Sequence, residues 1–199
     1  MFLEIPVNQQ ENLGWIEVIT GSMFSGKTEE LIRRLRRAQI ARQHVEIFKP
    51  AVDNRYHEKH VVSHDANEIP SVVVNNAREI LDYVDLNRTQ VVGIDEAQFF
   101  DDEIVDVCNE LADNGVRVIV AGLDMDFRGK PFGPMPYLMA VAEYVTKVHA
   151  VCMETGNLAH YSYRKTDDDR LVLVGEKQVY VPLSRAAFVR KMRQKAEKK

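Results

Sequence analysis

The sequence has only two cysteines, and it lacks a long apolar run and a basic leader. Each of these features excludes a class of protein. It contains no stretch of about 18 consecutive apolar residues, so we expect no membrane-spanning helix and no membrane partner. The first 14 residues lack a basic segment followed by an apolar core, which indicates no secretory signal and a cytoplasmic location. The two cysteines, Cys108 and Cys152, could form a disulfide, but they would stay reduced in the cytoplasm. Cys108 falls on an apolar helical face, where we expect a small core residue.

The net charge of −4 conceals an uneven distribution along the chain. Residues 185–199 carry seven Lys or Arg and one Glu, a local charge of +6, which leaves −10 on the remainder. A basic tail of this kind can bind nucleic acid. The acidic body would repel a phosphate backbone, however, so we favour a solvated terminal helix or a disordered end and expect no nucleic-acid partner.

The pattern of apolar residues predicts an α/β fold, because strands and helices alternate along the first 150 residues. Buried strands are expected at 15–20, 45–49, 72–74, 91–94 and 116–121. Helices are expected at 29–43, 77–84 and 101–114, and from 136 to about 146. Beyond residue 150 the chain has only short β-prone pieces, at 159–163, 171–174 and 179–181. We therefore expect a nucleotide-binding α/β domain over 1–148, a small β-rich domain over 149–183 and a basic tail over 184–199.

The strongest local motif is residues 21–28, GSMFSGKT, which match the phosphate-binding pattern G-x-x-x-x-G-K-[ST]. The motif follows a predicted strand and opens a predicted helix, as its mechanism requires. Glycine allows a tight turn and a close approach of backbone N–H groups to an anion. Lys27 would add positive charge near the β- and γ-phosphates, and Thr28 would offer a hydroxyl to Mg²⁺. The expected nucleotide-binding residues are Gly21, Ser22, Met23, Phe24, Ser25, Gly26, Lys27 and Thr28.

A second motif is the apolar strand at 91–94, which runs into Asp95 and Glu96. This is the Walker B pattern, in which Asp95 would hold Mg²⁺ directly or through water. Glu96 could orient water in an ATPase or accept a proton from a substrate alcohol in a kinase. From these residues alone the function is Mg-nucleotide-dependent phosphoryl transfer or hydrolysis.

The ordered set of short motifs resembles the type II thymidine kinases, over roughly residues 15–181. The resemblance rests on GSMFSGKTEELIRRLRR at 21–37, DNRY at 53–56, SHD at 63–65, IDEAQFF at 94–100, AGLD at 121–124, FRG at 127–129, PFG at 131–133, AVCME at 150–154 and YSYR at 161–164. It implies a P-loop NTPase-like parallel sheet flanked by helices, a small C-terminal lid with a lasso, and a homotetramer. It also implies ATP and Mg²⁺ as cofactors and thymidine as substrate, in nucleoside salvage for DNA synthesis.

The resemblance further assigns roles to individual residues. Glu96 matches the family's general base, and Asp95, Glu96, Ala97 and Gln98 match its second nucleotide-contacting segment. The lasso corresponds to 171–180. The substrate-binding residues it implies are Met23, Asp53, Arg55, Phe99, Leu123, Phe127, Phe132, Val172, Val174, Gly175 and Tyr180. The phenylalanines among them could instead be core aromatics, and at most one of Phe99 and Phe100 is expected to face a ligand.

The sequence departs from this family at the structural zinc of the lid, whose ligands usually form C-x-x-C and C-x-x-[CH] pairs. Here the four positions hold Cys152, Thr155, Ser184 and Ala187. Neutral hydroxyls are poor zinc ligands and alanine offers none, so we expect no zinc and no other bound metal beyond the nucleotide's Mg²⁺. The lid would then need another source of stability. The hypothesis is an apolar replacement by Pro182, Leu183, Phe188 and Val189, with residues 185–195 helical against the lid.

Two functions other than a thymidine kinase stay open from the sequence. One is a nucleotide-regulated ATPase or nucleic-acid-binding module that uses the basic tail, although no basic groove interleaved with aromatics is visible. The other is a degenerate kinase that binds nucleotide without turnover, which the presence of Lys27, Thr28, Asp95 and Glu96 together argues against. In a thymidine kinase, deoxyuridine and related 5-substituted analogues are expected as minor substrates, because an apolar pocket discriminates weakly between similar bases.

Overall fold

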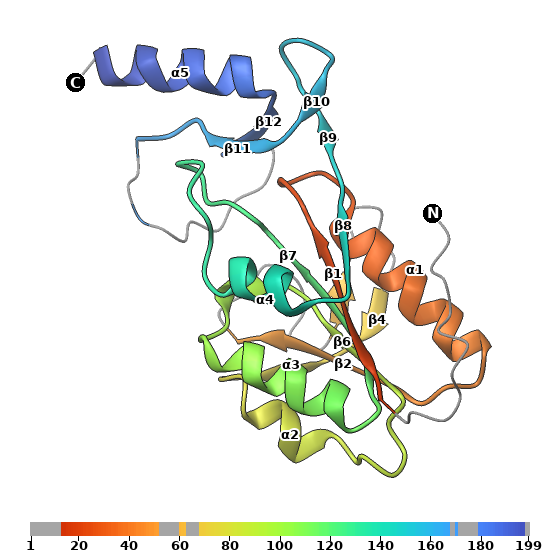
Figure 1. Cartoon of the computed structure of the whole chain (residues 1–199). Helices are drawn as coiled ribbons and strands as arrows, with labels where there is room; N and C mark the ends of the chain where they lie inside the picture. Colours follow the sequence, from red (N-terminus) through yellow and green to blue (C-terminus); the bar gives the residue numbers. More distant parts are fainter. Residues whose placement is uncertain (1–12, 52–59, 63–67, 168–169, 171–178, 198–199) are drawn as a thin grey trace.

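The computed structural model describes residues 13–51, 60–62, 68–167, 170 and 179–197 (Figure 1). Its centre is a six-stranded sheet in the order β5-β2-β6-β7-β1-β8, and every neighbouring pair is parallel. The strands are β1 (Trp15–Thr20), β2 (Val45–Pro50), β5 (Val72–Val74), β6 (Val91–Ile94), β7 (Arg117–Gly122) and β8 (Tyr144–Lys147). Among the described residues, no helix is long and apolar enough to cross a bilayer.

Helices cover both faces of this sheet, which explains why its strands are almost wholly apolar (Figure 1). One face packs on α1 (Lys27–Ile40), whose buried positions include Leu31 and Leu35. The other face packs on α2 (Glu79–Tyr83), α3 (Glu103–Asp113) and α4 (Met135–Val141). Cys108 lies on the buried side of α3 with no exposed surface, as the sequence predicts, and burial raises the pKa of its thiol to about 12. The predicted α/β class is therefore confirmed.

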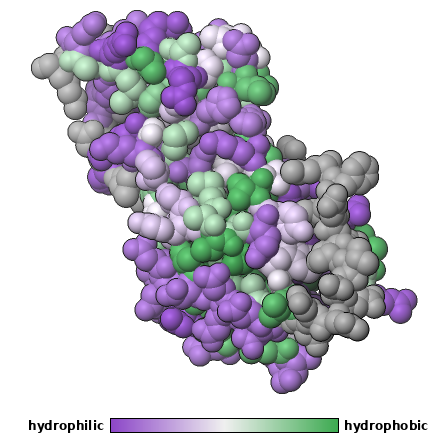
Figure 2. All heavy atoms as spheres, viewed as in Figure 1, coloured by the Kyte–Doolittle hydropathy of each residue, from purple (hydrophilic) through white to green (hydrophobic). Residues whose placement is uncertain are grey.

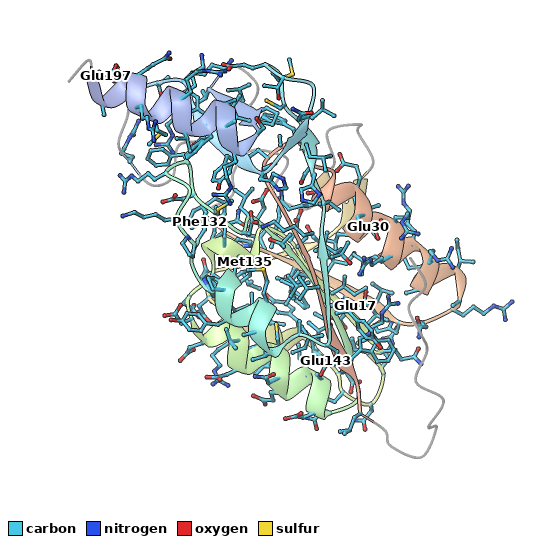
Figure 3. All side chains as sticks on the ribbon, turned by 45° about the horizontal axis from the view of Figure 1, so that its top comes forward. Glu17, Glu30, Phe132, Met135, Glu143 and Glu197 are labelled. Carbon is cyan, nitrogen blue, oxygen red and sulfur yellow. The ribbon has the colours of Figure 1, made fainter. Side chains whose placement is uncertain are left out.

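The predicted helix from 136 to about 146 is wrong beyond its first half. The helix α4 ends at Val141, and Tyr144–Lys147 forms β8, which pairs in parallel with β1. The segment is a half-buried edge strand in which burial alternates along the chain. The Glu143 carboxylate, which Figure 3 labels, accepts a hydrogen bond of 2.7 Å from the backbone N–H of Ile16. This contact anchors the start of β8 beside β1.

Beyond the sheet, the chain forms small antiparallel hairpins and a terminal helix (Figure 1). The hairpins pair β3 (His60–Val62) with β4 (Glu68–Pro70), β9 (Ala150–Val151) with β10 (Leu158–Ala159), and β11 (Tyr161–Arg164) with β12 (Tyr180–Leu183). The predicted strand at 159–163 is thus two strands, because Ala159 pairs with β9 whereas Tyr161 pairs with β12. The predicted strand at 171–174 lies outside the described residues. The helix α5 (Arg185–Glu197) confirms the expected terminal helix.

A buried ion network ties α1 to the sheet. Glu17 on β1 has no exposed surface, and its carboxylate accepts hydrogen bonds of 2.6 Å from both Arg34 and Arg117. Arg34 also donates to Glu30, on its own helix, and to Thr146 on β8. Desolvation raises the pKa of Glu17, but the hydrogen bonds, that from Arg117 foremost, hold it below its ordinary value.

We expect Glu17→Gln to lower the free energy of unfolding by about 3 kcal/mol at neutral pH, because two guanidinium groups lose their buried counter-charge. A carboxylate with a depressed pKa stabilises the fold above its unfolded pKa and loses that contribution as pH falls. The difference between wild type and variant should therefore narrow below about pH 4.5. Urea denaturation across pH measures both effects, with the exposed Glu103→Gln as control. A variant as stable as wild type at neutral pH would contradict the assignment.

Candidate functional site

The chain leaves β1 at Thr20 and turns through residues 21–26 into α1. Gly21 has no room for a side chain, because a Cβ there would lie 2.1 Å from the carbonyl oxygen of Val148. Gly26 has φ +84°, in the left-handed region that glycine tolerates, and its carbonyl accepts the first hydrogen bond of α1. The turn therefore points backbone N–H groups and the helix N-terminus into the space in front of it, as an anion-binding loop requires.

This loop lines a small cavity that opens to solvent. Inside it, the Lys27 ammonium donates a 2.9 Å hydrogen bond to the Ser22 carbonyl oxygen, and Ser25 donates to the same oxygen at 2.7 Å. The residues that line the cavity are Met23, Phe24, Ser25, Gly26, Lys27, Thr28, Glu29, Glu96 and Leu123. Most of the sequence-predicted phosphate-binding residues are thus brought together with the predicted general base.

Two carboxylates at the end of β6 face this loop. Asp95 is almost fully buried, and one of its oxygens lies 3.4 Å from the hydroxyl of Thr28, which donates to it. The other oxygen accepts a 2.9 Å hydrogen bond from the backbone N–H of Glu96. Glu96 has φ +52°, a left-handed conformation that is strained for a residue with a side chain. Strain of this kind persists where the surroundings hold it in place, and it often marks a functional residue.

The Gln98 side chain supplies that support. It is buried within the 3₁₀ turn Ala97–Phe99, donates a hydrogen bond to the Glu96 carboxylate, and accepts one of 2.9 Å from the backbone N–H of Leu123. The carboxylate is therefore held against the end of β7. The side chain of Ala97, by contrast, lies in the main core, and so does that of Phe100.

The residues of the predicted apolar wall fall into three groups in the structure. Met23 and Leu123 line the cavity itself. Phe99, which is partly exposed, meets Phe132 edge to face with ring centroids 5.7 Å apart. Phe127 and Tyr180 share a common neighbour, the guanidinium of Arg164. The other predicted substrate residues lie outside the described part of the chain: Asp53, Arg55, Val172, Val174 and Gly175.

Sequence reasoning assigned no role to β11, yet this strand contacts the site directly. The hydroxyl of Ser162 accepts a 2.9 Å hydrogen bond from the backbone N–H of Met23. Next to it, the Ser22 hydroxyl donates to the carbonyl of Ala159 at 3.3 Å. The C-terminal hairpins are therefore hydrogen-bonded to the phosphate loop. The polar alternation of YSYR at 161–164 was the available signal.

The four positions that hold zinc in the resembling family come together in the C-terminal unit. Burial opposes ionisation of the Cys152 thiol, but hydrogen bonds from Thr155 and Ser184 outweigh it and lower the thiol pKa to about 6. Ser184 also accepts a 3.5 Å hydrogen bond from the backbone N–H of Ala187, whose methyl is fully buried. One thiol, two hydroxyls and a methyl do not form a tetrahedral zinc site. Within the described ranges, no group of three or more His, Cys, Asp or Glu could hold a metal.

Apolar packing occupies the same region. The rings of Tyr161 and Phe188 stack with centroids 4.4 Å apart, and both are buried with Leu183 and Ala187. Val189, which the sequence placed in this cluster, is wrongly assigned, because it is 40% exposed on α5. The basic helix is also tied down by charge: Glu154 pairs with both Arg190 and Lys191.

We expect a zinc chelator to leave the thermal unfolding midpoint unchanged, because the packing around Phe188 replaces the metal. Elemental analysis of the purified protein should find well below one zinc per chain. The matched control is the triple variant Thr155→Cys, Ser184→Cys, Ala187→Cys, which restores four thiols at adjoining positions and should bind zinc. Stoichiometric zinc in the wild type would contradict the prediction.

Comparison with known proteins agrees with this geometry. A family model described as thymidine kinase matches residues 14–188. The thymidine kinase of Bacteroides fragilis (strain YCH46) is 56% identical over 198 residues, which cover 100% of this chain and 98% of that protein. The thymidine kinase of Porphyromonas gingivalis (strain ATCC 33277) is 59% identical over 190 residues, 94% of this chain and 92% of that protein. The chain therefore belongs to the thymidine kinase family and is a kinase.

Proposed function

We propose that this protein transfers the γ-phosphoryl group of ATP to the 5′-hydroxyl of thymidine, giving thymidine monophosphate for DNA precursor synthesis. The observation that carries the proposal is the carboxylate of Glu96, held in the cavity that the phosphate loop lines. A phosphate site and a base in one cavity are the two parts that phosphoryl transfer to an alcohol needs. The relatives that are named thymidine kinases supply the identity of the alcohol.

The phosphates of ATP would bind residues 21–28, where backbone N–H groups and the start of α1 supply partial positive charge. Lys27 would exchange its hydrogen bond to the Ser22 carbonyl for one to the β- and γ-phosphates. The hydroxyl of Thr28 and the carboxylate of Asp95 are adjacent oxygen ligands of the kind that Mg²⁺ prefers. Bound there, Mg²⁺ would neutralise charge on the phosphates.

Glu96 would accept the proton of the 5′-hydroxyl as that oxygen attacks phosphorus. Gln98 donates a hydrogen bond to one oxygen of the carboxylate, and Glu96 lines the cavity, so Gln98 would also position this base. Asp95, behind them, both faces Thr28 and fixes the backbone of Glu96. The metal site and the base would therefore be set at a fixed separation.

The thymine ring would lie among Met23, Leu123 and the paired rings of Phe99 and Phe132. Phe127 and Tyr180 would form the wall nearer the C-terminal unit. An apolar wall favours a 5-methyl group only modestly, so deoxyuridine should be a weaker substrate. We retain Asp53, Arg55, Val172, Val174 and Gly175 as further substrate residues on the basis of the resemblance.

The organisation of the chain belongs to the same proposal. Residues 1–148 would form the nucleotide-binding domain, 149–183 the lid with its lasso, and 184–199 the basic tail, in a cytoplasmic homotetramer. Apolar residues gather over α4 in Figure 2, and Tyr137, Val141 and Val145 are exposed on α4 and the edge strand β8. Such a patch supports self-association. Sedimentation of a monomer at micromolar concentration would refute the tetramer.

The test is phosphate transfer from Mg-ATP to a panel of nucleosides by the purified protein. We expect thymidine monophosphate as the main product, deoxyuridine monophosphate at a lower rate, and neither product when Mg²⁺ is chelated. ATP hydrolysis without any nucleoside monophosphate would overturn the proposal, and stimulation of that hydrolysis by DNA would point to an ATPase that uses the basic helix.

A further inference from the structure

Arg164 is the largest fully buried side chain in the described part of the protein, with 1% of its surface exposed. It lies on β11 and is paired across the hairpin with Tyr180 of β12. Its Nε and Nη2 atoms donate to the Tyr180 hydroxyl oxygen at 3.0 and 2.6 Å. Its Nη1 donates to the backbone carbonyl of Arg170. One guanidinium thus joins the chain before residue 171 to the chain after residue 178.

The same guanidinium lies over the ring of Phe127, with its central carbon 3.7 Å from the ring centroid. Phe127 follows β7, so the contact connects the main domain to the C-terminal hairpin. A cation over an aromatic face is attractive, more so where water is excluded. Phe127 is therefore held by a contact that a smaller or uncharged side chain could not make.

The geometry also fixes the Tyr180 hydroxyl. A phenol oxygen has two lone pairs and one hydrogen. Because two N–H groups of Arg164 occupy the lone-pair side, the hydroxyl hydrogen must point away from the guanidinium. A buried guanidinium is costly unless its donors are partnered, and these contacts partner three of its nitrogens. Such a residue at this place suggests a role beyond packing.

We propose that Arg164 is a positioning residue for the nucleoside, which aligns the ring of Phe127 and the hydroxyl of Tyr180 as one wall of the binding site. The proposal rests on the function proposed above, in which these two side chains face thymidine. Only arginine suits the position, because lysine is a point charge that cannot hold one oxygen with two N–H groups while stacking on a ring. Its contacts with Phe127 and Tyr180 lie on the nucleoside wall, whereas the phosphates would bind residues 21–28.

The test compares Arg164→Lys, Tyr180→Phe and the double variant by steady-state kinetics, with thymidine and ATP varied separately. Arg164→Lys should raise the KM for thymidine by about tenfold or more while the KM for ATP changes less than about twofold. The double variant should be much less impaired than the product of the two single effects, because both changes break the same contact. Independent, multiplying effects would overturn the proposal.

Arg34→Lys is the matched control, since Arg34 is a buried arginine with three side-chain partners in the main domain. It should lower the thermal midpoint without raising the KM for thymidine selectively. An Arg164→Lys protein that fails to fold, or whose two KM values rise together, would show a purely structural role and overturn the proposal. In that case Tyr180→Phe still tests the proposal, because a KM for thymidine equal to that of wild type in this variant would also contradict it. A wild type that makes no thymidine monophosphate would refute the proposed function itself.

Discussion

Replacing Glu96 by glutamine is expected to lower kcat for thymidine phosphorylation by about 100-fold or more, the usual contribution of a general base. The substitution keeps the shape of the side chain, and its amide oxygen can still accept the hydrogen bond from Gln98. The backbone strain at Glu96 is also retained, because glutamine has the same covalent constraints. The variant therefore removes basicity and charge but little else, so the KM for ATP should stay within about threefold of wild type.

Two further variants decide whether the loss of kcat in Glu96→Gln comes from lost basicity or from lost charge. Glu29 also lines the cavity, and Glu29→Gln removes the same charge without removing the proposed base, so its kcat should fall by less than about tenfold. Gln98→Leu keeps Glu96 but releases its carboxylate, and should give an intermediate loss. Full activity in Glu96→Gln would contradict the role of the base. Equal losses in the Glu96 and Glu29 variants would point to cavity charge instead.

Much of the main domain could be predicted because its signals are local. The strands at 15–20, 72–74 and 91–94 were expected with the observed bounds, since apolar runs in a sheet covered on both faces are continuous. Helix bounds differ from the predicted ones. The helix expected at 29–43 begins at Lys27, because the last two residues of the phosphate motif already form its first turn. It ends at Ile40, and Arg42 beyond it has φ +61°.

The edge strand β8 could not be predicted from its own residues. Residues 135–147 contain no glycine, and the helical pattern of α4 continues past Val141 without a break. What makes Tyr144–Lys147 a strand is the free edge of β1, to which Glu143 attaches it through the N–H of Ile16. A tertiary partner overrides local helix propensity here. The local signs were the strand-favouring residues Tyr144, Val145 and Thr146.

The candidate site likewise has parts that local sequence predicts and parts that depend on tertiary contacts. The phosphate loop and the acids after β6 are recognisable because the chemistry of each is contained in a few consecutive residues. The contacts of β11 depend instead on a hairpin that pairs residues 16 positions apart in the chain, Arg164 and Tyr180. An arginine in a sequence is ordinarily read as a surface charge. Only the fold shows that Arg164 is buried in contact with two aromatic rings.

Replacing Lys27 by methionine is expected to produce the other large loss, a fall in kcat of about 100- to 1000-fold, the usual effect of removing one preorganised charge from a transition state. Methionine preserves the length and the apolar stem but removes the ammonium that now bonds to the Ser22 carbonyl. The loop should keep its shape, because its turns are set by Gly21 and Gly26 and by the Ser25 hydroxyl, which bonds to the same carbonyl. The loss should therefore appear in catalysis and not in folding.

Kinetics and thermal unfolding of the Lys27→Met protein distinguish a loss of catalysis from a loss of folding. Charge develops on the transferring phosphoryl group, so kcat should fall further than the KM for ATP rises, while the KM for thymidine stays near that of wild type. Lys191→Met on α5 removes the same charge from a residue that pairs with Glu154, and should leave kcat unchanged. A Lys27→Met protein with normal kcat and only a raised KM for ATP would mean that the ammonium binds the ground state and the transition state equally. The phosphate loop would then hold the nucleotide, and the rate enhancement would have to come from the Mg²⁺ ligands and Glu96.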